Sequence, residues 1–469
     1  MLLQAPKIDH DWKDPFLEFV SNRMDQIEQD IAMNSISDIT KALFENRSEI
    51  MGQAALALIQ KKFGPYFEQT HCDCPNCHTR VKAKAEKVKR EVETTIGIIA
   101  LYRPYFYCHR CGTGFYPLDT ALGLCSGRTQ WDIQELETWL SAEMPYETAS
   151  ETLERCTGIK RSNCHSHEVA NEVAADLDIL DVCPEKAEIL SKINQLADGK
   201  FRRPVLMVGI DGAHGPMRPE PSPRSGKRGK GEWKEVKGFR IYLLGDERIV
   251  HLISWHQVMS DKELAADFSK IKQAGLIPED KVRICVIGDG APWIWNRIQE
   301  IYPEAKKVLD YYHCSEYIHK VAEVQYGKAS QTSQEWVEAT LTRLFLNQVD
   351  QVLSGMKRMK AQSEDAAKQI DKTIGYLEER KEMVNYGALR RGGYHIGSGG
   401  IESSNKFISN VRLKRSGAWW YPTNANNMLK LRCAKYNKTF DRLMERRRPK
   451  SDELSFFEKS GLRLVVDNE

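Results

Sequence analysis

Two short apolar runs in the middle of the chain each end in an Asp-Gly pair. Val205-Leu-Met-Val-Gly-Ile210 precedes Asp211, and Val282-Arg-Ile-Cys-Val-Ile-Gly288 precedes Asp289. Such runs predict buried strands, and a carboxylate that follows a buried strand lies at the rim where open α/β sheets bind their ligands. The alternative is that each Asp-Gly pair forms a simple turn.

The pattern around these two runs predicts a mixed sheet with helices between some of its strands. Three strands joined by hairpin-like connections are followed by an alternation of strands and helices. The expected strands cover residues 205–211, 236–244, 247–256, 282–288 and 306–310, and the expected helices cover residues 260–275 and 291–300.

Helical periodicity dominates the rest of the chain. We expect a helix from Pro15 to Ile27 and a further pair of helices over residues 37–62, with Ser35 and Ser37 as candidate caps. Residues 314–390 carry apolar positions at a spacing of three to four with charged residues between them, which predicts an almost purely helical segment.

Three short helices are also expected between residues 128 and 178. The first two cover residues 129–142 and 145–156, and the third begins near Lys160 after a turn that contains Gly158. A helix, a glycine turn and a serine-capped helix are typical of a helix-turn-helix, although an ordinary helical hairpin gives the same pattern. The candidate base-reading residues are Arg161, Ser162, Asn163, His165 and Ser166.

A third carboxylate, Glu402, follows the glycine-rich segment Gly397-Ser-Gly-Gly400 and opens an amphipathic stretch. Carboxylates are the ligands that Mg²⁺ prefers, and two such ions can clamp both sides of a phosphoryl displacement. Asp310 is expected to cap the helix that begins near His313 rather than to bind metal. His313 is either an auxiliary group that positions a phosphate or a buried, hydrogen-bonded histidine.

Four of the twelve cysteines form two matched C-x-x-C pairs: Cys74, Cys77, Cys108 and Cys111. Each pair can close a tight turn that directs two thiolates to one tetrahedral Zn²⁺, and expected strands over 91–101 and 103–108 complete a zinc ribbon. Redox-active pairs are the alternative. Because four cysteines leave no open coordination position, this zinc is expected to be structural. Seven Lys and Arg residues lie between the pairs, which suits either DNA binding or a small stapled domain.

The net charge of the 469-residue chain is only +3, but its basic residues are concentrated. Residues 406–450 hold thirteen Lys and Arg against two acidic residues, with tryptophan and tyrosine interleaved. Such a stretch is the electrostatic footprint of phosphate-backbone binding, and a solvated surface is the alternative. The candidate DNA-contacting residues here are Lys406, Arg412, Lys414 and Arg415.

The ordered set of motifs around the carboxylates resembles the DDE transposases of bacterial insertion sequences. These motifs are Gly288-Asp-Gly-Ala-Pro-Trp-Ile-Trp295, Val308-Leu-Asp-Tyr-Tyr-His313, Gly397-Ser-Gly-Gly-Ile-Glu-Ser403 and Arg412-Leu-Lys-Arg-Ser-Gly417. The resemblance is closest to the Kra-type family, is more distant to Mutator-like transposases, and spans roughly residues 140 to 440. It implies an RNase H-like core in which Asp211, Asp289 and Glu402 hold Mg²⁺ or Mn²⁺, with a helical insertion before Glu402.

The expected fold class is therefore multidomain α/β: an RNase H-like mixed-sheet core with an all-α insertion, preceded by a zinc ribbon and a helix-turn-helix. The expected domains are N-terminal helices (1–66), zinc ribbon (67–125), helix-turn-helix region (126–200), first part of the core (201–313), all-α insertion (314–390), second part of the core (391–440) and a basic, then mixed, tail (441–469).

The expected function is a DNA transposase that cleaves the ends of an insertion sequence and joins them to target DNA. We expect a homo-oligomer on double-stranded DNA, in the bacterial cytoplasm and associated with the nucleoid, since the chain has no signal region and no long apolar run. The alternatives are a transposase-derived DNA-binding regulator and an RNase H-like nuclease without strand transfer.

Overall fold

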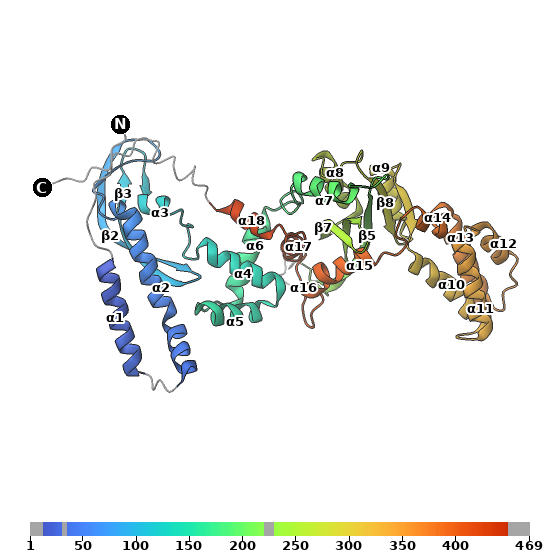
Figure 1. The fold of residues 1–469 in the computed structure, drawn as a ribbon, viewed down its shortest axis with the longest axis horizontal. Helices are drawn as coiled ribbons and strands as arrows, with labels where there is room; N and C mark the ends of the chain where they lie inside the picture. Colours follow the sequence, from blue (N-terminus) through green and yellow to red (C-terminus); the bar gives the residue numbers. More distant parts are fainter. Residues whose placement is uncertain (1–12, 31–34, 220–228, 449–469) are drawn as a thin grey trace. The chain divides into compact units, whose positions relative to one another are not determined.

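A computed structural model describes residues 13–30, 35–219 and 229–448 of the chain (Figure 1). It divides into two compact units, one formed by residues 1–170 with 444–469 and the other by residues 171–443. Much of the predicted tail, from residue 449 on, and residues 220–228 lie outside the described residues. No helix in the described ranges combines the length and apolar character needed to cross a membrane.

Unit 1 begins with two helices, α1 (Lys13–Asp30) and α2 (Ile36–Phe67). The side chain of Ser35 caps α2 by accepting a hydrogen bond from the backbone N–H of Asp38 (3.2 Å), as predicted. A pair of helices was expected over residues 37–62, but α2 continues through that whole range. Its one departure from helical geometry is at Phe63, beyond the expected segment.

The ribbon of unit 1 is a four-stranded antiparallel sheet in the order β1-β2-β3-β4. Its strands are β1 (His71–Asp73), β2 (Arg80–Thr94), β3 (Gly97–Cys108) and β4 (Thr113–Phe115). The prediction of one strand over 91–101 is wrong, because the hairpin turn falls at residues 95 and 96. Val92 and Ile99 lie on the two arms of the hairpin and face the same core against α2. Because apolar residues lie on both sides of the turn, the sequence has the pattern of one continuous strand.

Helices α3 (Pro117–Ala121), α4 (Trp131–Glu143), α5 (Tyr146–Thr157) and α6 (Asn163–Ala175) follow the ribbon. The last three correspond to the predicted helices, and Gly158 ends α5 in the left-handed conformation (φ 77°). The Ser162 hydroxyl accepts a hydrogen bond from the N–H of His165 (3.2 Å) and so caps α6. A small apolar core joins α4, α5 and the loop before α6: Ile133, Leu140, Ala149, Leu153 and Ile159.

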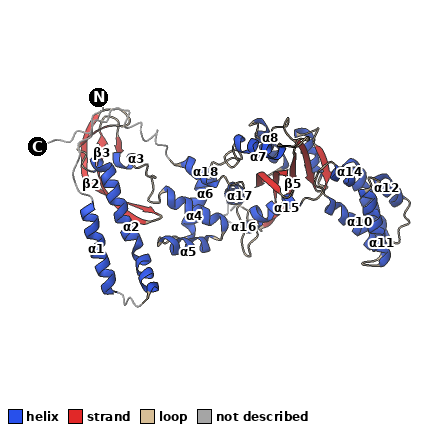
Figure 2. Ribbon diagram, viewed as in Figure 1, coloured by secondary structure: helices blue, strands red, loops and turns tan. Residues whose placement is uncertain are grey.

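Unit 2 contains helix α7 (Lys186–Ala197) and a five-stranded mixed sheet in the order β7-β6-β5-β8-β9 (Figure 2). Strands β5, β8 and β9 run parallel, whereas β6 and β7 are antiparallel to their neighbours. The strands are β5 (Val205–Met217), β6 (Glu232–Leu244), β7 (Ile249–Val258), β8 (Arg283–Gly288) and β9 (Lys306–Leu309). Each predicted strand of this region is present, and β5 and β6 are longer than predicted.

Helices cover both faces of the mixed sheet. On one face, α8 (Asp261–Gln273) places the ring of Phe268 4.6 Å from that of Phe239 on β6. The next residue of β6, Arg240, points to the opposite face, where it donates a hydrogen bond to the carbonyl of Gly400 (2.7 Å). A Cβ at Gly209 would lie 3.0 Å from the Ile401 side chain, so this glycine lets the segment around residue 401 approach β5 closely.

After α9 (Pro292–Ile301) and β9, residues 314–390 contain helices and no strand, which confirms the predicted helical character of this fully described segment. The helices are α10 (Tyr311–Tyr326), α11 (Gln331–Phe345), α12 (Val349–Lys357), α13 (Glu364–Glu378) and α14 (Tyr386–Arg391), with a 3₁₀ turn at Lys381–Met383. Helix α10 packs against α11 and α13, and Figure 1 shows this bundle on the β8 side of the sheet.

The chain then returns to the sheet through a helix with an irregular middle. Helix α15 (Gly399–Asn405) continues into a π-helical turn (Lys406–Asn410) and α16 (Val411–Leu413). Helix α17 (Pro422–Tyr436) packs against β7, and α18 (Phe440–Arg447) follows. A π-helical turn inside an α-helix often marks a functional site, and this one directly follows the helix that carries Glu402.

Candidate active site

Asp211 lies inside strand β5 and not at its end. Strand β5 pairs with β8 only as far as Gly209, which lies opposite Ile287, but it pairs with β6 as far as Met217. The expectation that the Asp211-Gly pair ends a strand or forms a turn is therefore wrong, because pairing with β6 keeps β5 extended. Asp211 instead lies just beyond the point where β8 leaves β5.

Asp289 follows directly after β8, as predicted, and its loop is held by two hydrogen bonds. Its carboxylate Oδ1 accepts one from the N–H of Ala291 (2.9 Å), and its carbonyl accepts one from the indole N–H of Trp295 (2.9 Å). The Trp295 ring is buried in unit 2. The end of β8 thus holds Asp289 at the same edge of the sheet as Asp211.

Glu402 lies in the first turn of α15, and the residue before that helix orients it. The hydroxyl of Ser398 donates a hydrogen bond to Glu402 Oε1 (2.6 Å), while the Ser398 N–H donates to Asp310 Oδ2 (2.5 Å). Asp310 is completely buried, and its Oδ1 accepts a hydrogen bond from the N–H of His313 (2.7 Å). The predicted cap of α10 is confirmed, and the same carboxylate also anchors the segment that brings Glu402 back to the sheet.

The charges of Asp289 and Glu402 act on Asp211. The pKa of Asp211 is raised to about 6, chiefly by burial and also by the charges of Asp289 and Glu402, against the opposing effects of the Gly212 N–H and the charge of His313. A nearby divalent cation has the opposite effect because it favours the ionised carboxylate. Three mutually repelling carboxylates therefore have the chemistry of a cation site.

Sequence reasoning missed Asn405, which contacts the site directly. Its side-chain amide donates a hydrogen bond to Asp211 Oδ2 (2.7 Å), and the residue is only 5% exposed. Asn405 lies three positions after Glu402 on the same helix, a spacing that places both residues on one face. That spacing is the sequence signal that identifies it.

The predicted DNA-contacting residues divide into exposed and buried ones. Lys406, Lys414 and Arg415 are exposed. Arg412 is only 3% exposed, with its guanidinium carbon 5.3 Å from the centre of the Trp420 ring. A guanidinium in this position packs in the interior, so the expectation that Arg412 holds a phosphate at the surface is corrected.

A similar division applies to the start of α6 in unit 1. Ser162 and Asn163 are exposed, as a base-reading role requires. The Arg161 side chain is 8% exposed and bridges Glu93 (2.5 Å) and Glu137 (3.7 Å), so it joins α6 to the ribbon and α4. The expectation of Arg161 as a base-reading residue is corrected for this reason.

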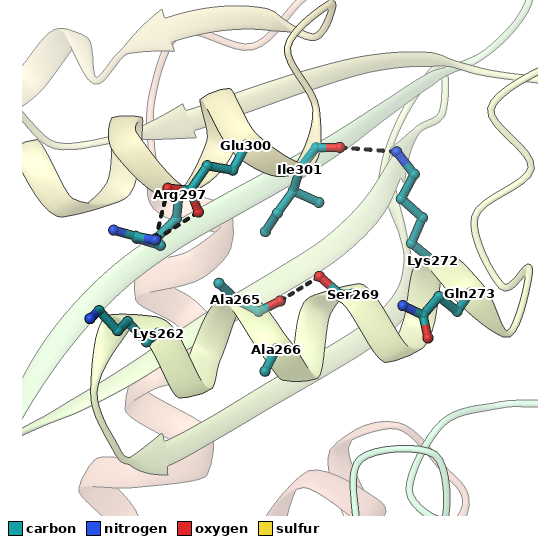
Figure 3. Close-up of a pocket in the computed structure, with 9 residues that line it drawn as sticks. All are labelled: Lys262, Ala265, Ala266, Ser269, Lys272, Gln273, Arg297, Glu300 and Ile301. Carbon is teal, nitrogen blue, oxygen red and sulfur yellow. Dashed lines mark hydrogen bonds and ion pairs between the residues drawn. The ribbon is translucent and has the colours of Figure 1, made fainter.

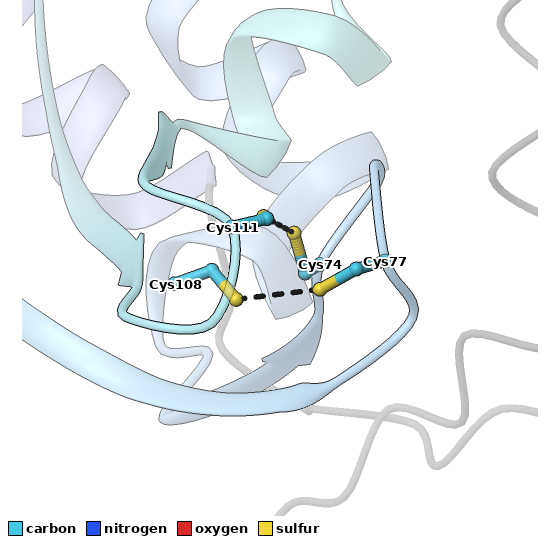
Figure 4. A group of neighbouring side chains, drawn as sticks. All are labelled: Cys74, Cys77, Cys108 and Cys111. Atoms are coloured by element: carbon cyan, nitrogen blue, oxygen red, sulfur yellow. Dashed lines mark hydrogen bonds between the residues drawn. The ribbon is translucent and has the colours of Figure 1, made fainter.

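The four predicted cysteines of the ribbon come together (Figure 4). Within the described ranges they are the one set of three or more potential ligands whose donor atoms all lie within 4.8 Å of one another. The Sγ atoms of Cys74 and Cys111 are 3.5 Å apart, as are those of Cys77 and Cys108. Tetrahedral Zn–S bonds of about 2.3 Å require S–S separations of roughly 3.8 Å. The cluster could therefore bind zinc.

The two cysteine turns have the same backbone structure. The residues after the second cysteines, His78 and Gly112, have positive φ (55° and 73°), and their N–H groups donate to the carbonyls of Cys74 and Cys108 (both 2.9 Å). Such tight turns direct two thiols to the same side. The repeated geometry supports one shared ligand set rather than two separate cysteine pairs.

A threonine two positions after the second cysteine completes each turn. Thr113 lies 3.1 Å from the Cys111 sulfur and Thr79 lies 3.3 Å from the Cys77 sulfur. These hydrogen bonds lower the pKa of the Cys111 thiol to about 6 and lower the pKa of the Cys77 thiol from its ordinary value. The thiolate, which is the form that binds metal, is favoured at both positions.

A separate open groove lies between α8 and α9 (Figure 3). None of the three acids lines it, and two of its cations are partnered: Arg297 contacts Asp261 (3.1 Å) and Glu300 (2.6 Å), and Lys272 contacts Glu279 (3.1 Å). Glu300 is the one acid among the residues that line it, so the groove does not bring several carboxylates together as the edge of the sheet does.

The double hydrogen bond of Asp310 gives a first prediction. In Asp310→Asn, one carbonyl oxygen cannot serve both the His313 and the Ser398 N–H groups, so one buried donor loses its acceptor. We expect the free energy of unfolding to fall by about 1–3 kcal/mol in urea titrations. Ser398→Ala, which keeps the backbone N–H donor, is the matched control and should fall less. An unchanged urea midpoint in Asp310→Asn would show that this anchor contributes nothing.

A protein-family profile with the description Uncharacterised protein family (UPF0236) matches residues 78–448, and this family is typically one of transposase-like proteins. Among solved structures, the chain is similar to the Drosophila P element transposase strand transfer complex. That similarity has 10% sequence identity and a TM-score of 0.32, and it covers 66% of this chain and 92% of that chain. A similarity this weak does not establish that the two proteins share a fold. No curated protein matches the chain.

Proposed function

The chain belongs to the uncharacterised protein family UPF0236, and from this premise we propose that it is a DNA transposase of the DDE type. The observation that carries the proposal is the convergence of Asp211, Asp289 and Glu402, which come from β5, the end of β8 and α15. The effect of the other two carboxylates on the pKa of Asp211 supports their proximity.

The strand order supports an RNase H-like core for unit 2. Across the sheet, the strands follow one another as the third, second, first, fourth and fifth strands of this unit in the chain. The first, fourth and fifth of them are parallel. This arrangement is what the resemblance to Kra-type and Mutator-like transposases implies. The helical segment between Asp289 and Glu402 corresponds to the expected insertion.

The donor set of the three acids fits Mg²⁺ or Mn²⁺, which prefer carboxylate oxygens. Asp211, Asp289 and Glu402 would together hold two such ions. When bound, such ions supply a nucleophile at neutral pH and stabilise the leaving oxygen. Asn405 and Ser398 each hold one oxygen of a carboxylate and so fix the direction of the remaining lone pairs.

The proposed reaction has two steps. The oxygen of a water molecule attacks the phosphorus of a phosphodiester at the element's end, the P–O3′ bond breaks, and a 3′-hydroxyl is left on the element. That 3′ oxygen then attacks a phosphorus of target DNA and displaces the target's own 3′ oxygen, so one phosphodiester forms as another breaks. His313 is the proposed auxiliary group, because it lies close enough to influence Asp211.

The proposal assigns DNA contact to both units. Ser162 and Asn163, exposed at the start of α6, read the ends of the element, while Lys406, Lys414 and Arg415 hold phosphates beside the acids. The cysteine cluster holds one structural zinc ion. Two element ends must be joined in one reaction, so the active form is proposed to be a homo-oligomer on DNA.

The test is a cleavage and joining assay with the full chain, Mg²⁺ or Mn²⁺, and labelled DNA carrying the sequences that flank the gene. The expected products are a nick or break at the element's end and a strand joined to a target plasmid. Binding without cleavage would instead indicate a transposase-derived regulator. Cleavage without joined product would indicate an RNase H-like nuclease.

A further inference from the structure

The zinc ribbon has a row of cations along one face of β2. Exposure alternates along the first half of the strand, with Arg80, Lys82 and Lys84 exposed and the residues between them half-buried. Because alternate residues of a strand point to the same side, these three cations share one face of the sheet.

Irregularities in the pairing of β2 and β3 keep later cations on that same face. The register shifts between Ala83 and Ala85 and again between Ala85 and Val88. Beyond them the exposed positions change from even to odd numbers, so Lys87 and Lys89 are exposed. Irregular pairing of this kind accompanies a change in which residues of a strand point to a given face.

The two remaining basic residues of the hairpin face the core and are structural. Arg103 is 4% exposed and contacts both carboxylate oxygens of Asp119 (2.6 and 2.8 Å), and Arg90 contacts the same carboxylate. The seven basic residues between the cysteine pairs thus divide into two that hold the ribbon together and five that face outward. A purely structural role, which is the alternative, explains only Arg90 and Arg103.

The outward cations are largely without partners. Among the described residues, no ion pair or side-chain hydrogen bond joins Arg80, Lys82 or Lys87 to another group, and Lys84 contacts only the face of the Tyr107 ring (4.9 Å). Lys89 is paired with Glu91 (2.8 Å). We define the ribbon row as Arg80, Lys82, Lys84 and Lys87. One exposed acid, Glu86, stands beside it, so the net charge of residues 80–87 is +3.

We propose that the ribbon row is a binding surface for the phosphate backbone of double-stranded DNA. Alternate residues of a strand are about 6.6 Å apart, close to twice the 3.4 Å rise between successive phosphates of one DNA strand. Arg80, Lys82 and Lys84 follow one another at this spacing and so complement a regular line of phosphates. A single strand is less suited, because its binding relies on successive stacking rings and the Tyr107 ring beside this row is already covered by Lys84.

This inference rests on the proposed function for its partner, and it adds a DNA-binding surface that is remote in sequence from the acids. Non-specific DNA binding measures it without any cleavage. The probe is a labelled 30-bp duplex of arbitrary sequence, and the measurement is the slope of log affinity against log salt concentration for the full chain. Removing one lysine that neutralises a phosphate should flatten that slope by about 0.9.

The test variant is Lys82→Gln, Lys84→Gln and Lys87→Gln together, and its slope is expected to flatten by up to roughly 2.7. The matched control, Lys320→Gln, Lys328→Gln and Lys372→Gln in the helical insertion, removes the same charge from other exposed positions and should leave the slope near that of wild type. Glu86→Gln removes the repelling carboxylate and should strengthen binding about two-fold. Zinc content and melting temperature report the fold of each variant.

A slope in the ribbon variant equal to that of the control overturns the proposal. A flatter slope on an RNA duplex but not on DNA also overturns it, as does an effect confined to single-stranded DNA. The outcome separates from that of the transposase assay. If the wild-type protein never cleaves DNA but the salt slope of its DNA binding depends on the ribbon row, the proposed function is rejected and the proposed binding surface is retained. If the protein cleaves DNA but the salt slope does not depend on the ribbon row, the proposed binding surface is rejected and the proposed function is retained.

Discussion

Asp289→Asn is expected to abolish DNA cleavage, with a loss of at least about 10³-fold, while DNA binding and the fold persist. The amide removes the charge that two divalent ions require, and a loss of this size corresponds to about 4 kcal/mol of transition-state stabilisation. The amide oxygen can still accept the hydrogen bond from Ala291 that shapes the loop. The measurement is the rate of cleavage in the assay above, with binding followed separately by fluorescence anisotropy.

The same result is expected for Asp211→Asn and Glu402→Gln. Glutamine at position 402 keeps an oxygen for the Ser398 hydroxyl, and Asn405 can rotate its own amide to match an amide at position 211. Each variant therefore loses charge with little loss of packing. Removing the charge at position 211 also removes a buried carboxylate whose pKa is already raised.

Glu300→Gln is the matched control for the three acids. It removes a carboxylate from the groove between α8 and α9, on an exposed part of the same unit, and should cleave at the wild-type rate. Retained cleavage in any one of the three site variants would remove that residue from the proposed triad. Equal loss in the control would mean that unit 2 is sensitive to charge in general.

The centre of the unit 2 sheet could be predicted because β5 and β8 contain near-continuous apolar runs with distinct ends. The position of Asp211 within β5 could not, because polar and glycine residues continue the strand only through pairing with β6. An Asp-Gly pair has the local chemistry of a turn, and a neighbouring strand overrides it here. Local propensity determines the backbone conformation only where no pairing with a neighbouring strand overrides it.

The return of Glu402 illustrates a second limit. The sequence marks it with a glycine-rich segment, but 113 positions separate it from Asp289, and only tertiary contacts bring the two together. Those contacts run through Asp310 and Ser398. A buried carboxylate that caps one helix and anchors another has no periodic signature, so the cap could be predicted and the second role could not.

Basic residues show a third limit. Composition identifies where cations are concentrated, but not which of them face outward. Arg161 and Arg412 are held in the interior by Glu93 and by the ring of Trp420, respectively. Their long side chains allow burial when a carboxylate or an aromatic face receives the guanidinium. Position along a helix or strand, and not charge, separates such residues from those that can reach DNA.

Purified wild-type protein is expected to carry one equivalent of zinc by elemental analysis, and Cys77→Ser is expected to lose it and to destabilise unit 1. Zinc bound by four thiolates contributes about 10–16 kcal/mol in small domains, comparable to the whole stability of a domain at about 5–15 kcal/mol. The ribbon has a small apolar core, chiefly Val92, Ile99 and Leu101 against α2. Loss of the ion should therefore melt the sheet that carries the ribbon row.

Cys156→Ser is the matched control, since this cysteine is exposed on α5 and lies outside the cluster. It should keep the full zinc content and the wild-type melting temperature. Hydrogen exchange can localise the damage in Cys77→Ser: amides of β2 and β3 should lose protection, while those of β5 and β8 in unit 2 should keep it, because that sheet has its own core. Wild-type protein prepared without chelator and free of zinc would contradict the assignment. A Cys77→Ser protein that still carries one full equivalent of zinc would show that the ion has other ligands.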